Sequence, residues 1–101
     1  MVELNQLNNF LVENKHRNVI LFFTADYCTP CYPLKTEFVK LQNSSNKNNM
    51  QMIDMENSVD VGIQYKITKV PCLRVYNNLQ LIFEYVGTDK GTFVKNISKY
   101  L

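Results

Sequence analysis

The segment NVILFFTADYCTPCYP, residues 18–33, decides the fold because its pattern changes in the middle. Residues 18–24 are mostly apolar without alternation, which is typical of a central β-strand covered by helices on both faces. Beyond the two cysteines the apolar positions follow helical spacing, at Leu34, Phe38 and Leu41. Cys28 and Cys31 therefore stand where a buried strand gives way to a helix.

Two cysteines separated by two residues at a helix start have a defined chemistry. The helix N-terminus presents unpaired N–H groups and the positive end of the dipole, so it favours the thiolate form of Cys28. Cys31 lies one turn further on and can displace a thiol that is disulfide-bonded to Cys28. Pro30 suits the first helical turn, whereas Pro33 lies deeper and is expected to cost one backbone hydrogen bond.

The same spacing also occurs in half of a zinc site and in incidental pairs of buried cysteines. Structural zinc sites usually have a second such pair or two histidines. Here only Cys72 and His16 remain as further ligands of those types. The strand and helix around the pair favour redox chemistry, so the pattern predicts no bound metal and no cofactor.

The chain as a whole has 101 residues and is 46% apolar, which fits one globular domain over residues 1–101. Its formal charge is +2 and its basic residues are scattered, apart from a triplet at residues 15–17 that is expected to cap a helix end. We therefore expect no nucleic-acid partner.

The search for targeting signals and the number of cysteines indicate the cellular compartment. The longest apolar run, residues 19–23, is too short to span a bilayer, and the N-terminal residues do not form a signal peptide. Three cysteines are too few for a secreted disulfide framework. We expect a soluble, cytoplasmic monomer without a membrane partner.

The remaining elements follow from periodicity and turn residues. Their order predicts an α/β fold with a central mixed β-sheet flanked by helices on both faces. The expected helices cover residues 3–14, part of 57–67, and the chain after the N-cap residue Asp89. The expected strands are a stub at residues 1–2, then 50–55, 72–77 and 79–86, with a loop over 43–49 and a hairpin turn at Asn77 and Asn78.

Several segments, in the same order, resemble the thioredoxin family over nearly the whole chain. FFTADYCTPC, residues 22–31, resembles the family strand that leads through a tryptophan to CGPC. MIDMEN, residues 52–57, resembles the acidic-tipped third strand, and YKITKVPCLRVYNN, residues 65–78, resembles the segment with a cis proline. YVG, residues 85–87, resembles the glycine before the last helix. The resemblance implies the thioredoxin fold.

The resemblance also assigns roles to individual residues. It implies that Cys28 is the attacking thiol and Cys31 the buried resolving thiol. Pro71 matches the cis proline, and the backbone of Val70 before it would pair with a peptide substrate. Tyr27 replaces the usual tryptophan and would form an aromatic lip beside the pair, although a plain surface tyrosine is an alternative. The expected substrate-binding set is Tyr27, Thr29, Pro30, Val70 and Pro71.

Some positions depart from the family pattern. Phe22 stands where family members usually bury an aspartate, six residues before the first cysteine, and Met50 stands where a basic residue precedes Asp54. Asp26 does not match that aspartate and is expected to be a solvated surface charge. Without a proton acceptor under Cys31, we expect slower resolution of mixed disulfides or the use of another group.

Cys72 follows the matched cis proline directly. We expect a buried structural thiol, because free cysteine packs as a small hydrophobic residue. The alternative is a third redox or cluster-binding sulfur near Cys28 and Cys31.

The resemblance implies a protein thiol–disulfide oxidoreductase that reduces protein disulfides and maintains cell redox homeostasis. Its partners would be disulfide-containing proteins and a separate electron donor similar to thioredoxin reductase. Two alternatives stay open: a binding module of the same fold that turns over poorly, motivated by Phe22, and a zinc or iron–sulfur site that uses Cys28 and Cys31.

Overall fold

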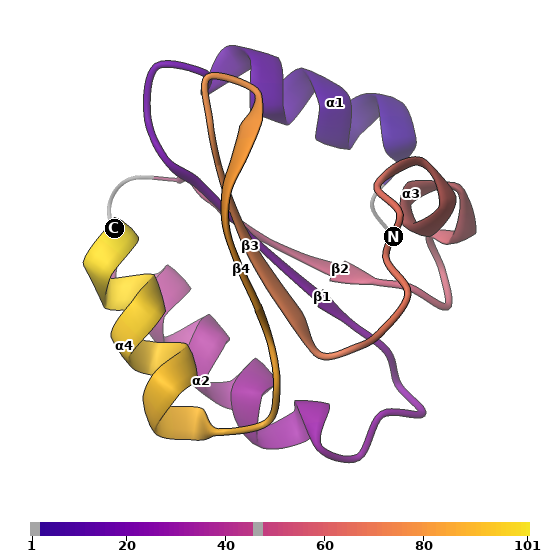
Figure 1. The fold of residues 1–101 in the computed structure, drawn as a ribbon, viewed down its shortest axis with the longest axis vertical. Helices are drawn as coiled ribbons and strands as arrows, with labels where there is room; N and C mark the ends of the chain where they lie inside the picture. Colours follow the sequence, from indigo (N-terminus) through magenta and orange to yellow (C-terminus); the bar gives the residue numbers. More distant parts are fainter. Residues whose placement is uncertain (1–2, 46–47) are drawn as a thin grey trace.

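The computed structural model describes residues 3–45 and 48–101, and within them a four-stranded mixed sheet lies between two layers of helices (Figure 1). The predicted α/β architecture is confirmed, while the expected strand stub at residues 1–2 lies outside the described residues. The elements in chain order are α1 (Leu4–Glu13), β1 (Val19–Thr24), α2 (Cys31–Ser44), β2 (Met50–Asp54), α3 (Val59–Gln64), β3 (Cys72–Asn77), β4 (Gln80–Val86) and α4 (Lys90–Tyr100).

The sheet has the strand order β2-β1-β3-β4. β1 pairs in parallel with β2 and antiparallel with β3, and β4 pairs antiparallel with β3. Helices α2 and α4 lie on one face of the sheet, and α1 and α3 lie on the other (Figure 1). No helix within the described part of the chain is long and apolar enough to cross a membrane.

The central strand β1 is buried along its whole length, as its unbroken apolar pattern predicts. Successive side chains of a strand point to opposite faces. Phe22 therefore packs on the face of α2 and α4, where its ring centroid lies 5.5 Å from that of Phe38 and 4.8 Å from that of Phe93. Phe23 packs on the face of α1 and α3, beside Tyr65. The strand ends at Thr24.

The β3–β4 hairpin turns one residue later than the sequence predicted. Asn78 and Leu79 have φ angles of 52° and 66°, so these two residues form the turn and β4 begins at Gln80. Positive φ at both central residues is the geometry of the tight hairpin turn that matches strand twist. The Asn78 amide also donates to the carbonyl of Lys15, at 3.0 Å, and ties the hairpin tip to the chain after α1.

Two predicted helix boundaries are tested by side-chain contacts. Asp89 is confirmed as an N-cap, because its carboxylate accepts from the Thr92 amide at 2.8 Å. The basic triplet does not cap α1 itself: the Asn14 amide donates to the Phe10 carbonyl, and Arg17 donates to the Asn14 side chain.

The expected loop at residues 43–49 is shorter than predicted, because α2 continues to Ser44. The last residue of this segment, Asn49, is buried, and its side-chain amide donates to the carbonyl of Asn18 at 2.8 Å. Residues 46–47 lie outside the described residues. The segment therefore ends as a packed connection that leads into β2.

Candidate active site

The paired cysteines lie in the turn between β1 and α2 and at the first residue of that helix. The Cys28 amide donates to the Ala25 carbonyl, and the Cys31 amide donates to the Cys28 carbonyl, each at 3.1 Å. Pro30 is the N-cap residue with φ −64° and ψ −15°. Pro33 occupies the third helical position, where an amide would have no intrahelical acceptor, so its predicted cost of a hydrogen bond is wrong.

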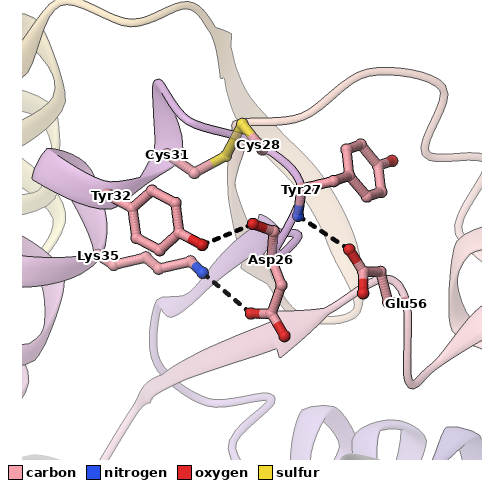
Figure 2. The surroundings of a disulfide bond; sticks show 7 residues. All are labelled: Asp26, Tyr27, Cys28, Cys31, Tyr32, Lys35 and Glu56. Carbon is pink, nitrogen blue, oxygen red and sulfur yellow. Dashed lines mark hydrogen bonds and ion pairs between the residues drawn. A yellow bond between two sulfur atoms is a disulfide. The ribbon is translucent and has the colours of Figure 1, made fainter.

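The two cysteines form a disulfide, and their Cα atoms lie 5.3 Å apart (Figure 2). Cys28 retains 7% of its surface, whereas Cys31 is fully buried at 0%. Both pack with Ala25 and against Val70. Cys28 is therefore the more exposed residue of the pair, and Cys31 is enclosed.

Asp26 links the segment before Cys28 to the first turns of α2. Its carbonyl accepts a hydrogen bond from the Tyr32 hydroxyl at 2.6 Å, and its carboxylate lies 3.4 Å from the Lys35 ammonium (Figure 2). The Asp26 side chain is 64% exposed, which confirms the prediction of a surface charge. This link holds the two ends of the cysteine turn together from the solvent side.

A second link holds the same segment from the side of the sheet. The Tyr27 amide donates to the Glu56 carboxylate at 2.9 Å (Figure 2). Glu56 is held in turn by Asp54, whose side chain accepts from the Glu56 amide at 2.9 Å. Sequence reasoning identified neither Glu56 nor the contacts of Tyr32 and Lys35, because these contacts join segments whose approach the local pattern does not show.

The Val70–Pro71 peptide bond is cis, as the resemblance implied. Val70 packs against the cysteine pair, and Pro71 is buried at the start of β3. Within residues 3–45 and 48–101, the Val70 amide and carbonyl take part in none of the backbone hydrogen bonds. An extended peptide beside Cys28 would thus find a free donor and a free acceptor at Val70.

Tyr27 lies at the surface, in agreement with the alternative of a surface tyrosine, and does not form a lip over the disulfide. Its side chain is 73% exposed, and its ring points away from the disulfide (Figure 2). It forms one wall of an open groove of about 500 Å³ whose other walls come from α3 and the loop after it, including Val59, Ile63 and Ile67. Thr29 and Pro30 are exposed beside the pair. Among the five predicted substrate-binding residues, Val70 packs against the cysteine pair.

Cys72 is buried, with 2% of its surface exposed, and packs on the face of α1 and α3. Its thiol donates to the Glu84 carboxylate at 3.6 Å, and burial, together with the charge of Glu84, raises the pKa of Cys72 to about 11. The predicted buried thiol is confirmed. Nowhere in the described ranges do three or more His, Cys, Asp or Glu side chains gather as metal ligands.

Comparison with known proteins agrees with this geometry. The thioredoxin family model matches residues 2–99. Thioredoxin from Ictalurus punctatus is 28% identical over 105 residues, covering 99% of this chain and 98% of that protein, and thioredoxin from Coprinus comatus is 28% identical over 101 residues, covering 98% and 91%.

Solved structures share the fold. Fasciola hepatica thioredoxin superposes with a TM-score of 0.87 at 17% identity and covers 99% of this chain and 96% of that one. Plasmodium falciparum thioredoxin superposes with a TM-score of 0.85 at 20% identity, covering 100% and 97%. Four strands, four helices and the cysteine turn thus have the thioredoxin fold. The chain belongs to the thioredoxin family, and its cysteine pair is that of a thiol–disulfide oxidoreductase.

Proposed function

We propose that this protein reduces disulfides of other proteins and so maintains redox homeostasis, with Cys28 as the attacking thiol and Cys31 as the resolving thiol. The unequal burial of the two cysteines carries the proposal. A foreign disulfide reaches Cys28 but not Cys31, so attack and resolution fall to different residues.

The reaction begins with the reduced pair. The Cys28 thiolate attacks one sulfur of the substrate disulfide, and the electron pair of the broken S–S bond leaves with the other sulfur, which takes up a proton. Cys31 then loses its proton and attacks the Cys28 sulfur. The Cys28–Cys31 bond forms, the bond to the substrate breaks, and the second substrate sulfur leaves as a thiol after protonation.

The surroundings of Cys28 support binding of an extended protein segment. The free amide and carbonyl of Val70 supply strand-like pairing beside the cis Pro71, and main-chain pairing of this kind does not depend on sequence. Tyr27, Thr29 and Pro30 supply exposed contact surface next to the sulfur. These features favour disulfide-containing proteins over small disulfides as substrates.

We further propose that a separate reductase similar to thioredoxin reductase returns the electrons, and that the protein works as a monomer in the cytoplasm. Only three cysteines occur in the chain, and a reducing compartment keeps such a pair in its dithiol form. The proposal of this electron donor is based on the similarity of the chain to thioredoxins.

Insulin reduction tests the proposal, with dithiothreitol to recycle the protein. We expect turnover well above the dithiol background, and a fall of at least a hundredfold in Cys28→Ser, because the mixed disulfide no longer forms. Cys72→Ala serves as the matched control and should retain activity. Wild-type protein no faster than dithiothreitol alone, or an active Cys28→Ser, would contradict the assignment.

A binding module of the same fold is the second candidate, and the absence of a carboxylate at Phe22 favours it. The Cys31→Ala variant, which keeps the attacking thiol, separates the two candidates. Several partners captured as mixed disulfides on Cys28 support the reductase. A single partner held without a covalent bond, and held equally by the variant that lacks both cysteines, supports the module.

A further inference from the structure

Thr24, the last residue of β1, carries a buried hydroxyl without a hydrogen bond. The residue is 2% exposed, and its Oγ1 has no partner anywhere in residues 3–45 and 48–101. A buried polar atom without a partner is costly, and valine would fill the same space without that cost. Thr24 is also the only polar side chain on β1. We therefore expect the hydroxyl to form a hydrogen bond in another state of the protein, with a group that cannot serve as its partner in the disulfide form.

Strand alternation places Thr24 on the same face as the resolving cysteine. It shares this face with Ile20 and Phe22, both of which pack in the core under α2 and α4. Cys31 lies on the stripe of α2 that points to the same core, since Leu34 and Phe38 follow it at helical spacing and are fully buried.

The contact between Phe22 of β1 and Phe38 of α2 shows which part of the helix lies beside which part of the strand. Because β1 and β2 are parallel, α2 between them runs back along the sheet. From Phe22 to Thr24 the strand advances about 7 Å, and from Phe38 back to Cys31 the helix spans about 10 Å. Thr24 thus lies at the level of the first two turns of α2.

The residue after Thr24 shows that the end of β1 lies beside the cysteine pair. Ala25 packs directly with Cys28 and Cys31, and its carbonyl accepts the Cys28 amide. The end of β1 and the cysteine pair therefore pack together.

We propose that the Thr24 hydroxyl is the hydrogen-bonding partner of the Cys31 sulfur in the reduced protein. In the disulfide, Cys31 carries neither a proton nor a charge and gives the hydroxyl little to bind. After reduction the hydroxyl accepts from the thiol and donates to the thiolate, and hydrogen bonds to a charged group are the stronger ones. The hydroxyl thereby favours ionisation of Cys31, on a face where Phe22 supplies no carboxylate.

This role belongs to the second step of the proposed reduction and rests on that function. Within the mixed disulfide, Cys31 loses its proton to water, and the resulting thiolate breaks the bond between Cys28 and the substrate sulfur. Thr24 lowers the barrier to the loss of the proton. It does not affect attack by Cys28, which precedes it.

Attack by Cys28 and resolution by Cys31 can be measured as separate kinetic phases when the reduced protein reacts with Ellman's reagent. Attack by Cys28 releases the first thionitrobenzoate at a rate proportional to reagent concentration, and resolution by Cys31 releases the second at a rate independent of it. In Thr24→Val we expect a first phase within twofold of wild type and a second phase slowed about tenfold at neutral pH. The pH profile of the second phase should move upward by about one unit, since one unit corresponds to a factor of ten.

Two variants control for structure. Thr24→Ser keeps the hydroxyl and should restore most of the second-phase rate, and Thr36→Val, an exposed threonine change on α2, should alter neither phase. If Thr24→Val does not fold, Thr24→Ser and Thr24→Ala are compared instead, because they also differ by the hydroxyl. The second phase should then be about tenfold slower in Thr24→Ala than in Thr24→Ser, with similar first phases.

A second phase in Thr24→Val with wild-type rate and pH profile would overturn the role of Thr24 and leave the proposed function intact. Equal slowing of both phases would also overturn it, because that result indicates a structural change around the whole site. A wild-type protein without a first phase would instead contradict the proposed function itself.

Discussion

The two faces of the sheet are built from the same strands but differ in the charge that they carry. The face under α2 and α4 is a continuous apolar core around three phenylalanine rings, Phe22, Phe38 and Phe93. The face toward α1 and α3 also has an apolar centre, but at β3 and β4 it carries Arg74 and Glu84, joined at 2.8 Å.

Adjacent residues of a strand point to opposite faces, so a shift of one position in the sequence decides whether a charged side chain meets polar partners or an apolar core. Arg74 also donates to the Tyr65 carbonyl and to the Tyr76 hydroxyl, so its partly buried guanidinium has several partners. Around the three phenylalanine rings the core cluster is made of apolar side chains, and this is the face on which the redox helix α2 rests. A carboxylate at the position of Phe22 would therefore be surrounded by apolar side chains.

The largest expected effect comes from placing a carboxylate on the apolar face. We expect Phe22→Asp to lower the free energy of unfolding by about 4 kcal/mol, through the loss of ring packing and the burial of a charge. Phe22→Leu, which preserves the apolar character, should cost no more than about 1.5 kcal/mol. Urea unfolding of the disulfide form measures both. A loss below about 1 kcal/mol in Phe22→Asp would show that this face accepts a carboxylate.

A smaller effect is expected on the polar face. Glu84→Gln should cost about 0.5–1 kcal/mol, because Glu84 is partly exposed and Arg74 keeps its other two acceptors. High salt should shrink the difference between the two proteins, since it screens the ion pair. Glu37→Gln is a suitable control, because its ion pairs with Lys40 and Lys90 are longer, at 3.7 Å. Equal costs for the two variants would contradict a specific role for the pair on the polar face.

The smallest effect is a dependence of stability on pH that arises from Cys72. Burial and Glu84 raise its pKa to about 11 in the folded protein, whereas an unfolded thiol titrates near about 8.5. The neutral thiol therefore contributes stability below pH of about 8.5, and this contribution is lost as the pH rises toward 11. Unfolding free energies of wild type and Cys72→Ala, compared across this range, should converge. A constant difference would show that Cys72 titrates normally.

Much of the site could be predicted from local sequence. The apolar run before the cysteines, the helical spacing after them and the cap at Asp89 are short-range signals, and each is confirmed. The hairpin turn was misplaced because Asn77 and Asn78 are both good turn residues. The register of β3 and β4 settles the choice, and it shifts at Val75 and Tyr76, which strand alternation does not reveal.

The sequence by itself determined the fold class and the junction at which Cys28 and Cys31 lie, because periodicity and helix-start chemistry act over a few residues. Only the tertiary structure decided which cysteine is more exposed, which residues hold the cysteine turn, and that the buried Thr24 hydroxyl has no partner among the described residues. Each of these depends on contacts between segments far apart in the chain, such as Val70 with Cys28 and Glu56 with Tyr27. Such contacts exist only after the sheet has brought its strands together.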